Sequence, residues 1–125
     1  MSTTDPERFV EFVGREAGAA LRLVLVCEPE SHRVAYARED LQEQYRTAEI
    51  ADLAAYIRET TAADIPDSIS AVIGDLDAVV LCYESAVGVL FPVGDTQVLA
   101  SLDPTAASQL HEFAHSCQAF LDEMP

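Results

Sequence analysis

The chain has 125 residues, half of them apolar, and its charge is strongly one-sided: 22 Asp and Glu residues oppose 7 Arg residues, for a formal net charge of −15. It contains no lysine. A polyanion of this kind repels nucleic acids and anionic membrane surfaces, so we expect neither as a partner. The length suits one domain over residues 1–125, and the apolar fraction excludes an intrinsically disordered chain.

The first part of the chain predicts a helix followed by two strands. Asp5-Pro6-Glu7 offers an N-cap acceptor, a proline at the first helical position and an acid in the first turn, and Gly14 or Gly18 would end this helix. The apolar run Leu21–Cys27 is typical of a strand that is covered on both faces. After a turn, Arg33–Arg38 predicts the returning strand.

The middle of the chain predicts helical structure whose continuity stays open. Asp40-Leu41-Gln42-Glu43 has the spacing of a capping box, with Asp in the capping role. The helix that it begins, over Asp40–Thr60, either continues or breaks near Thr47. The segment Ser68–Ile73 is either a short strand or a helical turn, because its apolar residues fit both periods.

The last part predicts a three-stranded meander and a final helix. The β-rich runs Asp77–Glu84, Ala86–Pro92 and Thr96–Leu102 are separated by short turn signals. Asp103-Pro104-Thr105 repeats the capping pattern of the first helix. The apolar residues that would stripe the final helix are Leu110, Phe113, Ala114, Cys117, Phe120 and Leu121.

These elements give the order α-β-β-α-β-β-β-α. Helices before, between and after antiparallel strands indicate an α+β domain. We expect two layers, with the helices packed on a five-stranded, mainly antiparallel sheet.

The element order resembles that of the roadblock and profilin-like modules, small α+β domains that often dimerise and serve as platforms for partner proteins. The stretches Val34–Leu41 and Asp75–Val80, with the strand-to-helix passage Leu99–Leu110, are similar to an uncharacterised haloarchaeal domain family of unknown function. That resemblance implies no activity and no site residue.

The charge bias is also similar to that of proteins from salt-loving archaea, where molar potassium chloride screens repulsion between carboxylates. The first residues, Met1–Asp5, lack the basic and apolar segments of a signal peptide, and no apolar run has the ~20 residues of a membrane span. We therefore expect a cytoplasmic protein. Its three cysteines, Cys27, Cys82 and Cys117, lie in apolar stretches without a CxxC motif, and we expect all three to be buried.

One motif has the spacing of a catalytic site. His111-Glu112-Phe113-Ala114-His115 matches HExxH, in which His111 and His115 would bind zinc from one helix face and Glu112 would act as the base. The apolar stripe of the same helix would leave His111 and His115 near solvent and turn Glu112 away from the core. Zinc would also need a third ligand, and only Asp122 and Glu123 follow within reach. We interpret the match as coincidental, so we expect no catalytic residue, no bound metal and no cofactor.

The remaining charged residues point to surface roles. The pairs Glu28/Glu30 and Asp75/Asp77 flank turns and are typical of solvated loop charges. Arg33 and Arg38 bracket the second strand, where they would pair with acids such as Glu28, Glu30 or Glu39, or would contact a partner protein.

We therefore expect a non-enzymatic cytoplasmic interaction or regulatory module of a halophilic archaeon, forming a homodimer and binding a protein partner that the sequence does not identify. The first alternative is a small-molecule sensor domain, with a pocket between the sheet and the central helix. The alternation of small and large residues in the meander (Ala78, Val80 and Cys82; Val87 and Val89) leaves room for one. The second alternative is a minimal HExxH zinc hydrolase.

The charge excess predicts strongly salt-dependent stability. Raising potassium chloride from ~0.1 M to ~1 M shortens the screening length from about 10 to about 3 Å and weakens the carboxylate repulsion that favours the expanded chain. We expect the melting temperature, followed by circular dichroism, to rise across this range. A melting temperature that stays flat would contradict the salt-adaptation argument.

Overall fold

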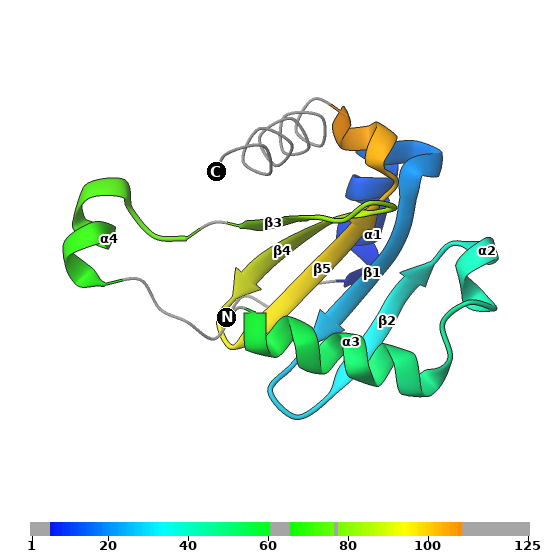
Figure 1. Cartoon of the computed structure of the whole chain (residues 1–125), viewed down its shortest axis with the longest axis horizontal. Helices are drawn as coiled ribbons and strands as arrows, with labels where there is room; N and C mark the ends of the chain where they lie inside the picture. Colours follow the sequence, from blue (N-terminus) through cyan, green and yellow to red (C-terminus); the bar gives the residue numbers. More distant parts are fainter. Residues whose placement is uncertain (1–5, 61–65, 77, 109–125) are drawn as a thin grey trace, which may run out of the picture.

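The computed structural model describes residues 6–60, 66–76 and 78–108. Within them it has four α-helices, five β-strands and two short 3₁₀ turns (Figure 1). The helices are α1 (Pro6–Ala17), α2 (Glu39–Gln42), α3 (Thr47–Thr60) and α4 (Asp67–Ile73). The strands are β1 (Leu21–Cys27), β2 (His32–Ala37), β3 (Val79–Cys82), β4 (Val87–Val93) and β5 (Thr96–Leu102), and the 3₁₀ turns are Gly18–Ala20 and Pro104–Ala107.

The five strands form one antiparallel sheet in the order β2-β1-β5-β4-β3. β3, β4 and β5 follow one another as the predicted meander, and β1 and β2 form the predicted hairpin. The central pair, β1 and β5, joins the two halves of the chain. The α+β class and the five-stranded antiparallel sheet are thus confirmed, while the final predicted helix falls on residues 109–125, outside the described part.

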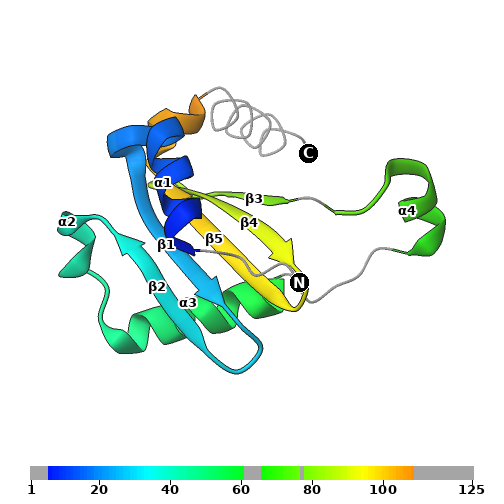
Figure 2. The same ribbon diagram turned by 180° about the vertical axis from the view of Figure 1, so that it is seen from behind.

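The layers differ from the expected two, because a helix covers each face of the sheet. Figure 1 shows α3 crossing one face, and Figure 2 shows α1 on the other. The cause is β1, whose side chains are apolar on both faces of the sheet. Both faces must therefore be covered to remove these side chains from water.

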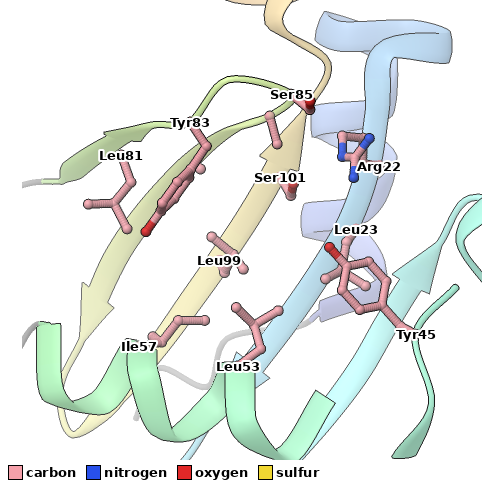
Figure 3. A pocket seen from close by; sticks show the side chains of 12 residues that line it. Arg22, Leu23, Tyr45, Leu53, Ile57, Leu81, Tyr83, Ser85, Leu99 and Ser101 are labelled. Atoms are coloured by element: carbon pink, nitrogen blue, oxygen red, sulfur yellow. The ribbon is translucent and has the colours of Figure 1, made fainter. Parts of the chain in front are cut away.

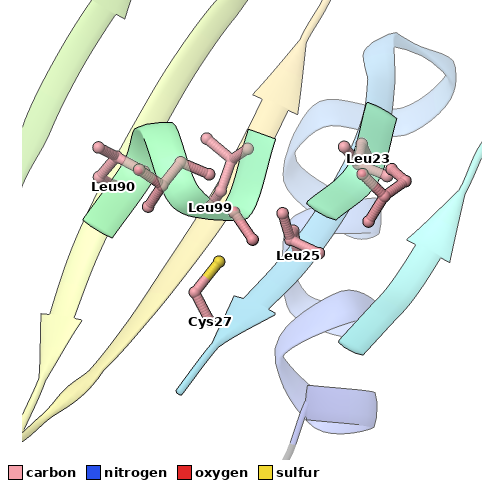
Figure 4. Packing of buried hydrophobic residues seen from close by; sticks show 8 residues of the cluster. Leu23, Leu25, Cys27, Leu90 and Leu99 are labelled. Atoms are coloured by element: carbon pink, nitrogen blue, oxygen red, sulfur yellow. The ribbon is translucent and has the colours of Figure 1, made fainter. Parts of the chain in front are cut away.

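The α3 face holds the larger cluster of buried side chains (Figure 4). Leu23, Leu25 and Cys27 project from β1 and pack beneath α3, beside Leu90 of β4 and Leu99 of β5. α3 contributes Ile50, Ala54 and Ile57, whose spacing places them on one face of the helix. Each fully buried Leu or Ile stabilises the fold by ~1.5–3 kcal/mol relative to an exposed one, so this cluster fixes α3 on the sheet.

On the other face, α1 packs against a second buried cluster of Leu21, Val24 and Val98. The rings of Phe9 in α1 and Phe91 in β4 meet edge to face, with centroids 5.7 Å apart. α1 passes through Gly14 and ends at Ala17, and Gly18 follows with φ +59°, a conformation that favours glycine.

The structure settles both of the ambiguous helical segments. The region after Arg38 does break: α2 is a single turn, and helical structure resumes at Thr47. Ser68–Ile73 is helical and forms most of α4, which ends at Gly74, where φ is +84°. Among the described helices, none combines the length and the apolar character needed to cross a bilayer.

Two of the three cysteine expectations can be checked, and one was wrong. Cys27 is buried under α3, and burial raises the pKa of its thiol despite the opposing effect of the Arg58 charge. Cys82 is exposed, because it lies on the edge strand β3 and points to the face opposite α3. Cys117 lies outside the described residues.

Four charged residues, Arg22, Arg38, Asp40 and Asp103, form what we call the Arg38 cluster. The Arg38 guanidinium donates to both oxygens of Asp103 at 2.7 and 3.1 Å, to Asp40 Oδ1 at 2.7 Å and to the Ala19 carbonyl at 2.8 Å. It thereby ties the end of β2 to the end of β5 and to the turn between α1 and β1.

The Arg38 cluster corrects three expectations. Arg38 pairs with Asp40 and Asp103 rather than with the three glutamates named above. Neither Asp is a side-chain N-cap: Asp40 lies inside α2, and Asp103 precedes the second 3₁₀ turn without a side-chain capping bond. A multidentate guanidinium is the stronger partner for these carboxylates than a single backbone N–H.

We expect Asp103→Asn to lower the free energy of unfolding at neutral pH by about 1 kcal/mol, as in a well-formed but partly exposed ion pair. The hydrogen bond from Arg38 holds the pKa of Asp103 below its usual value. The stability that Asp103 contributes is therefore present above the unfolded-state pKa of about 3.9 and is lost as the pH falls through the lower folded-state pKa. The free energy of unfolding, measured with urea from neutral pH downward, should fall less steeply with pH in Asp103→Asn than in the unmodified chain.

The matched control is Asp95→Asn, in the exposed β4–β5 turn. Its free energy of unfolding at neutral pH should match that of the unmodified chain, because the Asp95 side chain is exposed. Equal stability of Asp103→Asn and the unmodified chain at neutral pH would contradict the structural role of the Arg38 cluster.

Candidate functional site

The sequence-predicted site residues do not form a site in the part of the chain that the structure describes. His111, Glu112 and His115 lie outside it, so the interpretation of HExxH as coincidental stays a prediction. Glu28 and Glu30 are exposed in the β1–β2 turn. No group of three or more His, Cys, Asp or Glu side chains placed to hold a metal occurs within residues 6–60, 66–76 and 78–108.

The structure instead shows a cavity of about 340 Å³ between α3 and the sheet (Figure 3). We call it the pocket. Its volume lies at the small end of the ~300–1,000 Å³ that is usual for ligand sites. Its described lining residues are Arg22, Leu23, Tyr45, Leu53, Ile57, Leu81, Tyr83, Ser85, Ala86, Gly88, Leu99 and Ser101.

The pocket exists because one row of residues across the sheet has small side chains at its centre. Neighbouring strands place Leu81, Gly88, Ser101 and Leu23 in register, from β3 to β1. Glycine and serine leave a hollow between the two leucines. A Cβ atom at Gly88 would lie 3.2 Å from Leu99 Cδ1, so a larger residue there would require the Leu99 side chain to shift.

The next row on the same face is filled, which closes the pocket at one end. It consists of Val79, Leu90, Leu99 and Leu25 in register, and its leucines belong to the buried cluster under α3. Leu99 of this row, with Leu53 and Ile57 of α3, makes the apolar end of the pocket (Figure 3).

The opposite end of the pocket is polar, and its cation is placed by an irregularity in β1. Leu21 pairs with Leu102 and Leu23 pairs with Ser101, which leaves Arg22 as an extra residue on β1. A bulge of this kind re-aims a side chain. Arg22 therefore lines the pocket beside Leu23, although strict alternation would put it on the α1 face.

Hydroxyl groups accompany Arg22 around the pocket. Ser101 comes from β5 and Ser85 from the β3–β4 turn, and the Tyr45 hydroxyl points to the interior (Figure 3). Tyr45 follows α2, so the break between α2 and α3 places this ring at the pocket wall.

Tyr83 closes part of the rim through a contact with α3. Its hydroxyl shares a hydrogen bond with the hydroxyl of Tyr56. Burial, and then this hydrogen bond, raise the pKa of Tyr83 to about 12. Tyr83 thus stays neutral over the physiological range.

The charge of Arg22 is only loosely balanced. Its Nη1 lies 3.5 Å from Asp103 Oδ1, while both oxygens of Asp103 accept shorter hydrogen bonds from Arg38. The buried Nε of Arg22 has no hydrogen-bond partner among the described residues. Arg22 is also the one charged residue in the described lining.

This arrangement offers a positive charge, hydrogen-bonding groups and an apolar surface to a bound molecule. The described lining offers one guanidinium, four hydroxyl groups and an apolar end, and within it there is no carboxylate, imidazole or thiol to act as base or nucleophile.

Sequence reasoning missed these residues for a physical reason. The alternation in the meander left room for a pocket, but Val80, Cys82, Val87 and Val89 point to the other face, because β4 presents Gly88 and Leu90 to α3. The available signal was Arg22, a lone cation inside the apolar run Leu21–Cys27.

No curated protein shows significant sequence similarity to the chain. The family model named Domain of unknown function (DUF7522) matches residues 7–122. The expectation of an uncharacterised domain family is confirmed, and the chain belongs to the DUF7522 family of domains of unknown function.

Proposed function

We propose that the chain is a non-enzymatic regulatory module that binds a small molecule in the pocket. The observation that carries this proposal is the pocket itself: a cavity of about 340 Å³ with a polar end at Arg22 and Ser101 and an apolar end at Leu53 and Leu99. A concave, mainly apolar site with a few convergent polar groups is the usual form of a small-molecule site. The hypothesis of a small-molecule sensor domain, one of the alternatives from the sequence, therefore has the best geometric support.

The charged groups around the pocket also favour binding without catalysis. The acids nearest to the polar end, Asp40 and Asp103, are held by Arg38, and hydrogen bonds from that guanidinium keep the pKa of each carboxyl low. A carboxylate with a lowered pKa is a weak base at neutral pH.

The composition favours a particular cellular environment for this module. With a net charge of −15 and no lysine, the chain suits the cytoplasm of a salt-adapted archaeon, where concentrated ions screen its own repulsion. The same charge argues against nucleic acid and anionic membranes as partners.

A second role, as a homodimeric interaction module, is supported by α4. This helix stands away from the sheet in both views (Figures 1 and 2). Val72 and Ile73 are 82 % and 72 % exposed, and Ile69 and Leu76 are about half exposed. Exposed apolar side chains gathered in this way mark association surfaces.

A second copy of this chain is the occupant that the charges favour. Residues 68–74 carry no charged side chain in a protein of net charge −15. Two copies with the same negative charge meet at the lowest electrostatic cost where neither presents a carboxylate. A two-fold symmetric pair is the commonest closed arrangement.

The binding function predicts that Ser101→Leu abolishes ligand binding while the fold survives. Leucine at this position fills the hollow between Leu23 and Gly88, and filling a cavity commonly maintains or raises stability. Ligand-observed NMR with a fragment library in molar potassium chloride should find binders of the unmodified chain that compete with one another and are lost in Ser101→Leu. The control Ser31→Leu, in the exposed β1–β2 turn, should retain them.

Absence of any binder at millimolar fragment concentration would refute the proposed function. So would binding that persists unchanged in a folded Ser101→Leu protein.

The dimer predicts that Val72→Glu shifts the chain to monomer, because it places a carboxylate in the uncharged surface of α4. Sedimentation equilibrium at tens of micromolar protein in molar salt should show a dimer for the unmodified chain. It should also show a dimer for the control Ala51→Glu, an exposed position of α3. A strictly monomeric unmodified chain under these conditions would rule out the homodimer.

A further inference from the structure

We propose that the ligand of the pocket carries a carboxylate group on a short apolar body, and that Arg22 is the residue that binds the carboxylate. This inference rests on the proposed function, since it names the ligand class of the same pocket.

The first argument is the hydrogen-bonding capacity of Arg22. A guanidinium has five N–H donors, and the structure gives Arg22 one contact with a side-chain oxygen, at 3.5 Å, beyond a short hydrogen bond. Its side chain is 16 % exposed, so water reaches little of it, and Nε is buried without a partner in the described part of the chain. Burying a cation with few partners is costly, and Nε itself has no accessible surface. A ligand would therefore accept from the Nη groups, whose contact with Asp103 is long, and would recover part of that cost.

The second argument is the competition for Asp103. Arg38 takes both oxygens of this carboxylate at 2.7 and 3.1 Å, so Asp103 cannot also offer Arg22 a two-point pairing. A carboxylate entering from the pocket would supply that geometry, because its two oxygens match the guanidinium fork.

The third argument is the local charge. The protein as a whole repels anions, but Arg22 is the one charged side chain of the described pocket lining. Concentrated salt screens the distant surface carboxylates far more than a direct contact inside the pocket. An anionic group is thus favoured locally in the conditions to which the chain is suited.

The fourth argument is the separation of polar and apolar groups. Arg22, Ser85 and Ser101 lie towards one end of the pocket, and Leu53, Ile57 and Leu99 towards the other (Figure 3). A ligand that meets both ends has a polar head and a hydrocarbon or aromatic tail. The cavity of about 340 Å³ limits that tail to a small one.

The experiment compares octanoate with octan-1-ol, two probes with the same chain length and different head groups, by isothermal titration calorimetry in molar potassium chloride. We expect octanoate to bind the unmodified chain at least tenfold more tightly than the alcohol. In Arg22→Gln this preference should fall below about twofold, since the charge-assisted pairing is gone. The control Arg33→Gln, at an exposed position of β2, should keep the full preference.

A second measurement does not depend on the variant folding. Octanoate labelled with ¹³C at the carboxyl group reports its own ionisation by NMR. Bound next to Arg22, its pKa should lie below that of free octanoate, because an adjacent cation favours the ionised form. A bound pKa above the free value would overturn the inference, since that is the effect of an apolar site without a cation.

The outcomes separate the two proposals. If the alcohol binds as tightly as octanoate and both are lost in Ser101→Leu, the pocket binds small molecules but the carboxylate inference is wrong. The same conclusion follows if Arg22→Gln keeps the preference. If neither these probes nor the fragment library binds the unmodified chain, the proposed function itself fails.

Discussion

The rest of this fold depends on one strand that must be hidden from water on both sides. Six of the seven residues of β1 are buried, and they alternate between the two faces of the sheet. A single covering helix would leave half of them exposed, so the chain supplies α1 on one side and α3 on the other. The same strand forms hydrogen-bonded ladders with β2 and β5, which places it inside the sheet and gives the remaining strands their positions. Burial of β1 thus determines the layers, the strand order and the face on which the pocket opens.

The pocket follows from a change in side-chain size along the α3 face. Under the middle of α3 the cross-sheet row is rich in leucine, and one row further along glycine and serine replace them at the centre. Protein interiors are close-packed, so such a step leaves space that neighbouring side chains do not fill. The bulge at Arg22 adds a cation at the same place. A smaller residue at two positions and one extra residue in a strand are enough to turn a continuous core into a cavity with a polar end.

The parts of this fold that were predictable from sequence are those governed by local pattern. β1 and β5 begin and end where their apolar runs do, and α1 begins at its proline and ends just before Gly18. The edge strand β3 is shorter than its β-rich run, because only one neighbour holds it.

Contacts between distant residues were not predictable. Asp103 binds Arg38, 65 positions away, and no local rule links them. The pocket depends on register across four strands, and the displacement of Arg22 depends on a bulge that apolar alternation conceals. The HExxH residues His111, Glu112 and His115 lie outside the described part of the chain, so their interpretation rests on the sequence.

The distribution of tyrosines gives this protein an optical property. The chain has four tyrosines and no tryptophan, so its near-ultraviolet emission comes from tyrosine alone. Tyr45 and Tyr83 line the pocket, and Tyr56 is hydrogen-bonded to Tyr83 at its rim. The fourth, Tyr36, packs against the cluster on the α1 face. Two of the four fluorophores therefore line the pocket, and the phenol–phenol hydrogen bond links one of them to a third, Tyr56. Any molecule that enters this space contacts half of the emitting groups directly, so the protein carries its own label for occupancy without an added dye.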